Sequence, residues 1–117
     1  MNVLIVGANG QLGTTLTHTL PRGGRCLALD LPEFDIVDAA AVAAAVAEAQ
    51  PDVIVNASAY TAVDRAEQEA GLAFAVNAEG PGNLARAAAK YRVRLIHVST
   101  DYVFDGTACS PYAPDAP

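Results

Sequence analysis

Four short apolar runs alternate with stretches of helical character, and this alternation limits the possible folds more than any other feature of the chain. The runs are rich in Val, Ile and Leu and cover residues 2–6, 25–29, 52–57 and 94–99. Strands that are apolar throughout are typical of a parallel sheet covered on both faces. Parallel strands are joined by right-handed crossovers through helices. The sequence therefore predicts an α/β fold with a doubly wound parallel sheet.

Helical segments fill the intervals between these strands. Leu12, Leu16 and Leu20 recur with the spacing of one helix face, and Asp38 is a favourable N-cap residue. The predicted helices cover residues 11–20, 38–50 and 72–91, with a further helix or turn beginning near residue 63. A Gly-Pro-Gly sequence at residues 80–82 lies within the last long helix. It weakens that prediction, because proline lacks the N–H donor of a helix interior.

The segment VGANGQLG, residues 6–13, supports two interpretations. Its Asn-Gly dipeptide is a hairpin-turn signal, whereas glycines at three-residue spacing are typical of a loop that brings the backbone against a phosphate. A strand precedes the segment and a helix follows it, which favours the phosphate loop. Gly7 permits the turn, Gly10 permits close approach of a pyrophosphate, and Gly13 permits close packing of the helix. The predicted phosphate donors are the backbone N–H groups of Gly10, Gln11 and Leu12.

Asp30 ends the second predicted strand, seventeen positions after the last of these glycines. A carboxylate there accepts a hydrogen bond from the 2′-hydroxyl of NAD and repels the 2′-phosphate of NADP. Arg22 and Arg25 are near in sequence and would tolerate a phosphate, so the choice between NADPH and NADH stays open. Asp35 is placed to bond an adenine amino group, or else is a solvated loop carboxylate, and Ile36 is placed to flank the ring. These residues predict a Rossmann-like dinucleotide site.

Two further groups of residues follow the third and fourth predicted strands, at the sheet edge where open α/β proteins bind ligands. Ser58 and Ala59 are small enough for a nicotinamide ribose to lie against the backbone, and Tyr60 is placed to pack on the cofactor. Thr100 offers a hydroxyl that can bond a substrate carbonyl oxygen and stabilise its developing negative charge. His97 is expected to be a hydrogen-bonded histidine of the core.

The composition excludes several classes of function. The chain has 117 residues, about the size of one domain, and is 52% hydrophobic. Its net charge of −6 argues against a broad nucleic-acid-binding face, and no apolar run approaches the roughly 18 residues of a membrane span. Two cysteines form no disulfide framework, which predicts a cytoplasmic protein. No cysteine or histidine spacing indicates a metal site.

The sequences GANGQLG, DVIVNASAYTAVDRAE, NAEGPGNLARAAA and LIHVSTDYVFDG together resemble the extended short-chain dehydrogenase/reductase superfamily and, within it, the dTDP-4-dehydrorhamnose reductases. The resemblance runs from Met1 to about Gly106. It implies reduction of the C4 ketone of dTDP-6-deoxy-L-lyxo-4-hexulose, a dTDP-4-keto-6-deoxy sugar, to dTDP-L-rhamnose with NADPH or NADH. Carried over by position, the resemblance implies that the cofactor phosphates are bound by Gly10, Gln11 and Leu12, its adenosine ribose by Asp30, and its adenine by Asp35 and Ile36. It implies that the cofactor is also lined by Ser58, Ala59 and Tyr60. It further implies that Thr100 is the catalytic residue and that Thr100 and Asp101 contact the substrate.

This chain departs from the family in its catalytic pair, a tyrosine followed four positions later by a lysine. The residues four positions after Tyr60, Tyr91, Tyr102 and Tyr112 are Asp64, Leu95, Gly106 and Ala116. The resemblance therefore implies that residues 1–117 are the N-terminal part of a NAD(P)-binding domain, without the rest of that domain or the sugar-nucleotide-binding domain, and that they are inactive alone. The sheet is then expected to have the strand order 3-2-1-4 and to be incomplete at its C-terminal side. The family more often has alanine where this chain has Ser58.

Three points stay open at this level. An unpaired strand edge favours association, so a homodimer is an expected form. A non-catalytic nucleotide-binding subunit, resembling the regulatory subunit of methionine adenosyltransferase, is an alternative function. Another sugar-nucleotide epimerase or dehydratase is disfavoured by the sequence STDYVFDG.

Overall fold

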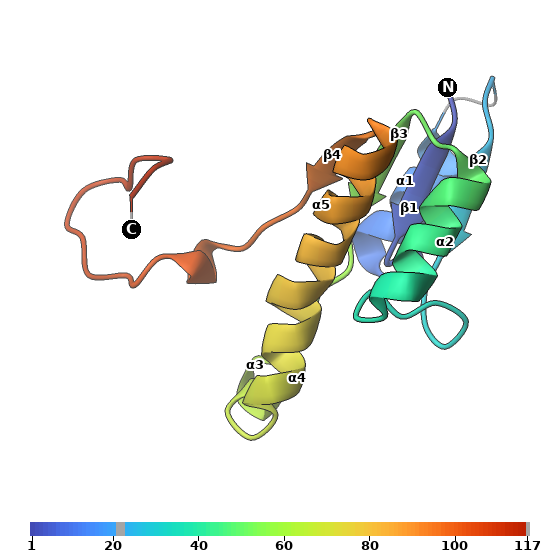
Figure 1. The fold of residues 1–117 in the computed structure, drawn as a ribbon. Coiled ribbons are helices and arrows are strands. Elements are labelled where there is room, and N and C mark those ends of the chain that lie inside the picture. Colours follow the sequence, from blue (N-terminus) through green and yellow to red (C-terminus); the bar gives the residue numbers. More distant parts are fainter. Residues whose placement is uncertain (21–22, 117) are drawn as a thin grey trace.

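Four parallel strands form the sheet of this protein in the order β2-β1-β3-β4, in a computed structural model that describes residues 1–20 and 23–116 (Figure 1). The strands are β1 (Val3–Val6), β2 (Cys26–Leu29), β3 (Val53–Asn56) and β4 (Arg94–His97). The α-helices are α1 (Gln11–Thr19), α2 (Ala39–Ala49), α3 (Val63–Ala66), α4 (Ala70–Phe74) and α5 (Gly80–Tyr91). A π-helical turn, η1 (Ala75–Glu79), joins α4 to α5, and a 3₁₀ turn, η2 (Asp101–Val103), follows β4.

The predicted strand order 3-2-1-4 is wrong. β3 pairs with β1, with Val3 opposite Val53 and Val6 opposite Asn56, and β2 lies on the other side of β1. Burial gives the physical reason: β1 and β3 are apolar and largely buried, as interior strands must be, whereas the side chains of β2 are mostly exposed, as an edge strand tolerates. The chain thus reverses its direction across the sheet beside β1, and such a switch point is where open α/β sheets bind ligands.

Helices cover both faces of the sheet, which confirms the doubly wound α/β architecture. α1 lies on one face, while α2 and α5 pack side by side on the other (Figure 1). The α1 face is built on Val3, Ile5 and Val53, with Leu16 and Leu20 packed against them. The α2 and α5 face holds the larger core, which includes Leu4, Val6, Ile54, Val42, Val46 and Leu84.

Two helix boundaries follow directly from local chemistry. The side chain of Asp38 accepts hydrogen bonds from the N–H groups of Ala40 and Ala41 at 2.9 and 3.0 Å, so the predicted N-cap is confirmed. The Gly-Pro-Gly sequence does not break the long C-terminal helix. Pro81 falls in the first turn of α5, directly after the π-helical turn, where its missing N–H costs least.

The C-terminal part of the described chain leaves the body of the protein. β4 forms the second edge of the sheet, and residues beyond it extend away from the helices (Figure 1). Within this segment the rings of Phe104 and Tyr112 stack with their centroids 4.6 Å apart. Among the residues described, no helix combines the length and apolar character that a membrane crossing requires.

Candidate functional site

A cleft of about 680 Å³ opens at the carboxyl ends of β1, β2 and β3, beside the switch point of the sheet. It brings together every predicted cofactor-binding residue except Gly13 and Tyr60: Gly7, Gly10, Gln11, Leu12, Asp30, Asp35, Ile36, Ser58 and Ala59 all line it. Phe34, Thr61 and Val76 also line it and were not predicted. Phe34 is buried in the loop after β2, and a large aromatic residue between the acidic residues Glu33 and Asp35 is the sequence signal that could have indicated a cleft wall there.

The glycine loop turns sharply between β1 and α1, and no hairpin forms there. Gly7 has a φ of +81°, and a Cβ at this position would lie 2.5 Å from the backbone nitrogen of Ser58. A Cβ at Gly13 would lie 2.1 Å from the carbonyl oxygen of Gly7. Both positions therefore require glycine. Gly13 acts by letting α1 approach the loop, which explains why it does not line the cleft.

The N-terminus of α1 faces the cleft without a capping side chain. Gly10 is its N-cap residue, and no acidic residue occupies the first turn. The N–H of Gly10 itself donates to the carbonyl of Gly7 at 3.3 Å. The first N–H groups of a helix have no partner within it. Of the three predicted phosphate donors, the backbone N–H groups of Gln11 and Leu12 are therefore free, whereas that of Gly10 is already bonded within the loop.

Asp30 ties the end of β2 to the glycine loop. Its Oδ2 accepts from the N–H of Asn9 at 2.7 Å, and its Oδ1 accepts from the N–H of Leu31 at 2.8 Å. Arg25 lies at the opposite end of β2, where its carbonyl accepts from the N–H of Val3. The structure thus removes Arg25 as a partner for a phosphate beside Asp30. The other predicted partner, Arg22, lies outside the described residues.

Asn56, at the end of β3, joins this strand to β4. It is fully buried, and its Oδ1 accepts from both the N–H and the hydroxyl of Ser58, at 3.1 and 2.6 Å. Its Nδ2 lies 3.0 Å from Nδ1 of His97. The network holds Ser58 at the cleft. The expectation of a core histidine was wrong in one respect, because His97 is hydrogen-bonded but exposed. Asn56 was not predicted, although a polar residue that ends a buried strand is a recognisable signal.

Tyr60 turns away from the cleft toward α4. Its backbone N–H donates to Oδ1 of Asn77 at 2.8 Å, and its carbonyl accepts from Nδ2 of Asn77 at 3.1 Å. The phenol donates to Glu69, which also forms a 2.6 Å ion pair with Arg65. The hydrogen bond to the Glu69 carboxylate raises the pKa of Tyr60. Hydrogen bonds from the side chains of Tyr60 and Arg65 in turn lower the pKa of Glu69. The hydroxyl proton of Tyr60 is therefore already engaged by Glu69.

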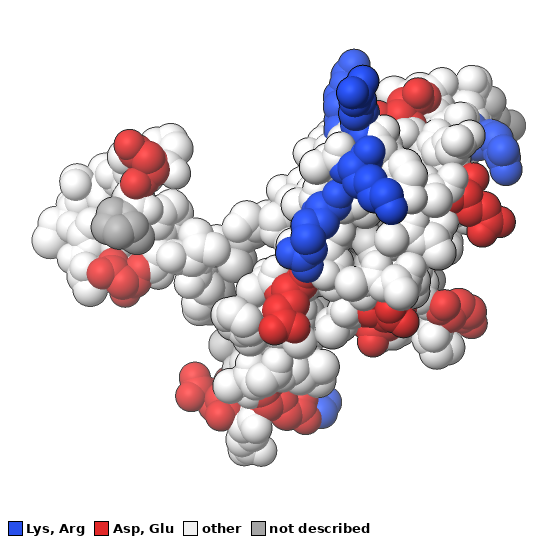
Figure 2. Space-filling model, viewed as in Figure 1, with Lys and Arg blue, Asp and Glu red and all other residues white. Residues whose placement is uncertain are grey.

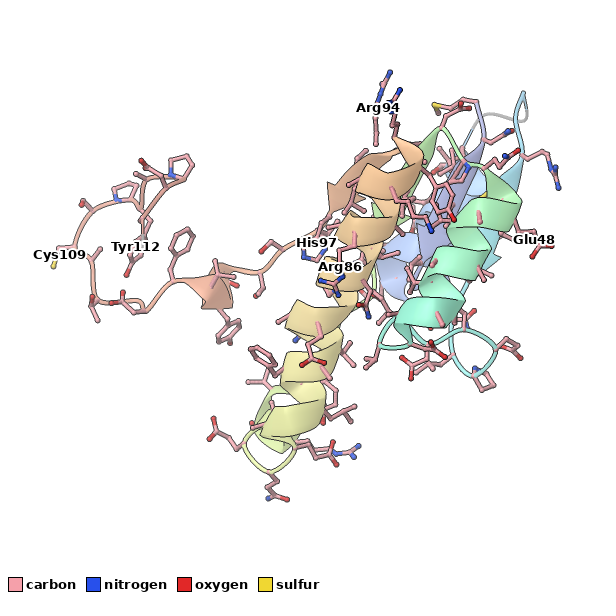
Figure 3. The ribbon with its side chains drawn as sticks, viewed as in Figure 1. Glu48, Arg86, Arg94, His97, Cys109 and Tyr112 are labelled. Atoms are coloured by element: carbon pink, nitrogen blue, oxygen red, sulfur yellow. The ribbon has the colours of Figure 1, made fainter. Side chains whose placement is uncertain are left out.

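Thr100 and Asp101 lie outside the cleft, in the extended segment after β4. The Thr100 hydroxyl accepts from the N–H of Tyr102 at 3.2 Å and donates to Oδ1 of Asp101 at 3.3 Å. Figure 3 shows that Tyr112 and Cys109 also belong to this segment. The structure thus assembles the predicted cofactor residues but does not bring the predicted substrate residues to them.

The charges around the cleft are negative. Asp30 and Asp35 line it, and within the described part of the chain no lysine or arginine does. Figure 2 shows the basic side chains over α5 and the start of β4, which carry Arg86, Lys90 and Arg94. In the same described residues, no group of three or more His, Cys, Asp or Glu side chains is arranged to hold a metal ion.

A glycine loop between a central strand and an uncapped helix, with an acidic residue ending the next strand, defines a Rossmann-like α/β protein. Comparison with known protein families then identifies the family of this chain. The chain matches the family described as the RmlD substrate binding domain over residues 1–117, and it belongs to that family.

Similar proteins carry a consistent set of names. The chain is 50% identical over 115 residues to dTDP-4-dehydrorhamnose reductase of Streptomyces griseus, a match that covers 97% of this chain and 38% of the relative. A dTDP-4-dehydrorhamnose reductase of Clostridium acetobutylicum superposes with a TM-score of 0.92 at 40% identity, over 100% of this chain and 42% of that one. The dTDP-4-dehydrorhamnose reductase of Bacillus anthracis, solved in complex with NADP, superposes with a TM-score of 0.85 at 42% identity. This match covers 90% of this chain and 38% of that one. The chain spans about two fifths of the length of these relatives.

Proposed function

We propose that residues 1–117 bind NADH or NADPH in the cleft, as the N-terminal part of the NAD(P)-binding domain of a dTDP-4-dehydrorhamnose reductase. The observation that carries this proposal is the uncapped N-terminus of α1, which faces a cleft that Asp30 also lines. A helix N-terminus favours a pyrophosphate through its free N–H groups and its dipole. Gly7 lines the cleft without a side chain, and its backbone packs against the backbone of Ser58.

Each wall of the cleft has its own part in holding the cofactor. The N–H groups of Gln11 and Leu12 bind the pyrophosphate, and Asp30 accepts from a ribose hydroxyl. Asp35 and Ile36 hold the adenine, while Ser58 and Ala59 lie along the nicotinamide ribose. Tyr60 supports this last wall through its backbone, since its side chain turns to Glu69.

The bound nicotinamide supplies the hydride for reduction of a dTDP-4-keto-6-deoxy sugar. Thr100 is the residue of this chain that bonds the ketone oxygen, and Asp101 contacts the substrate. For this role the segment after β4 has to lie closer to the cleft than it does in this structure. None of the tyrosines is followed four positions later by a lysine, so residues 1–117 alone do not turn over the sugar. The two free cysteines favour the cytoplasm as the site of action.

Calorimetric titration of the purified chain with NADH, NADPH and dTDP tests the cofactor proposal. We expect saturable binding of a dinucleotide at one site and no turnover of the keto sugar. Absence of binding to both dinucleotides contradicts the cofactor proposal, and turnover by this chain contradicts the expected inactivity. Co-purification with a methionine adenosyltransferase would favour the regulatory-subunit alternative.

A further inference from the structure

One continuous helical run, residues 70–91, carries two asparagines, Asn77 and Asn83, that bond to two different segments beside the cleft. Asn77 lies in the π-helical turn η1 and bonds both backbone groups of Tyr60, next to Ser58 and Ala59. Asn83 lies one turn into α5 and reaches the loop after β2. The second asparagine has no part in the function proposed above.

Asn83 supplies hydrogen-bond donors to a loop that has no regular secondary structure. It is 7% exposed, and its Nδ2 donates to the carbonyl oxygens of Ile36 and Val37 at 3.1 and 3.0 Å. Its Oδ1 accepts from the guanidinium of Arg86. A buried carbonyl without a donor is costly, so the Ile36 carbonyl in particular depends on this side chain.

α5 also fixes the same loop by direct packing. A Cβ at Gly80 would lie 2.8 Å from Cγ2 of Ile36, so the helix backbone presses against that side chain. Gly80 and Asn83 are three residues apart and therefore share a helix face. Ile36 is 5% exposed and lines the cleft beside Asp35. Loop 34–38 is thus held by a side-chain donor and by the helix backbone at once.

We propose that Asn83 is a positioning residue for the adenosine half of the cofactor. It holds loop 34–38 so that Asp35 and Ile36 form the adenine wall of the cleft. This proposal rests on the proposed function, because it takes an adenine nucleotide as the ligand. It differs from a general contribution to stability, since the contacts of Asn83 are with this loop and with Arg86.

The test compares Asn83→Asp with Arg86→Met and uses ADP-ribose as the probe. Asn83→Asp keeps the volume and the acceptor for Arg86 but replaces the donor that bonds Ile36 and Val37 with an acceptor. Arg86→Met removes the guanidinium and leaves the donor. Calorimetry gives the affinity for ADP-ribose. Hydrogen exchange of the Val37 and Asp38 amides, which donate to Asp35 at 2.9 and 3.1 Å, reports the order of the loop.

We expect Asn83→Asp to weaken ADP-ribose binding by roughly tenfold, the value of one buried hydrogen bond, and to speed amide exchange in the loop. Arg86→Met should bind ADP-ribose as the unaltered chain does. Unchanged affinity and unchanged exchange in Asn83→Asp would overturn the positioning role. A lowered melting temperature with unchanged affinity would also overturn it, because a merely structural residue gives that result.

If Asn83→Asp does not fold, Gly80→Ala displaces Ile36 without touching Asn83, and it must show the same selective loss of affinity or the proposal fails. If the unaltered chain does not bind ADP-ribose, the proposed cofactor function is contradicted. In that case the test of the positioning role is the hydrogen exchange of the loop amides by itself. Unchanged exchange in Asn83→Asp then overturns that role.

Discussion

Asp30 combines two tasks at the scale of a single residue. Its carboxylate fixes the glycine loop through Asn9 and fixes the turn after β2 through Leu31. It also lines the cleft together with Asp35, and among the described lining residues there is no lysine or arginine to offset these charges. A 2′-phosphate in this cleft would therefore meet negative charge, and we expect the cleft to bind NADH more tightly than NADPH.

Asp30→Asn should reduce the preference for NADH over NADPH. We expect the ratio of the NADPH to the NADH dissociation constant to fall by roughly fivefold, as removal of one partly screened charge gives. Glu48→Gln is the matched control, because Figure 3 shows Glu48 on the outer side of α2 and the overall change in charge is the same. Fluorescence titration with both dinucleotides measures the ratio. An equal ratio in all three proteins would show that Asp30 does not select the cofactor.

Gln11→Glu separates helix stability from phosphate binding. An acidic residue in the first turn of α1 stabilises the helix by about 0.3–1 kcal/mol through its dipole. The same charge opposes a pyrophosphate, so we expect a raised melting temperature together with weaker NADH binding. Gln11→Ala is the control and should alter binding little. Stronger or unchanged NADH binding in Gln11→Glu would place the pyrophosphate elsewhere.

At the scale of elements, the sequence predicts local structure well and pairing poorly. Val42 and Val46 with the cap Asp38 identify α2, and the glycine loop with Asp30 identifies one half of the cleft. The predicted strand order was wrong because either of two apolar runs, β3 or β4, could pair with the second edge of β1. Local sequence patterns do not show which of the two forms that pair. The π-helical turn and the place of Thr100 outside the cleft depend on contacts that no local pattern encodes.

The segment from Tyr60 to α4 should lose stability in acid. Hydrogen bonds from Tyr60 and Arg65 lower the pKa of Glu69 in the folded chain. A lowered folded-state pKa means that this contribution is complete above the unfolded-state pKa and disappears as the pH falls through the folded-state value. Tyr60→Phe should flatten the dependence of the melting temperature on pH in the range below the ordinary pKa of a glutamate. An identical pH profile in Tyr60→Phe would show that the Tyr60 bond does not shift Glu69.

At the scale of the whole molecule, β4 presents a sheet edge with apolar side chains. Ile96 is 55% exposed and Val98 is 47% exposed. Edges of this kind associate unless charge interrupts them. We propose that the chain forms a homodimer through β4, and the prediction is a mass that rises with concentration in sedimentation. Ile96→Lys should abolish this rise, whereas Val63→Lys, an exposed position away from the edge, should not. A monomer at every concentration would contradict the dimer.

The central claim is that the cleft beside β1 holds a dinucleotide on the N-terminus of α1. The most direct measurement is an NMR titration of the ¹⁵N-labelled chain with NADH, followed at every backbone amide. We expect saturable shifts centred on Gln11, Leu12 and the residues next to Asp30 and Ile36. Saturable shifts confined to another surface, or no shifts at any concentration of NADH, would contradict it.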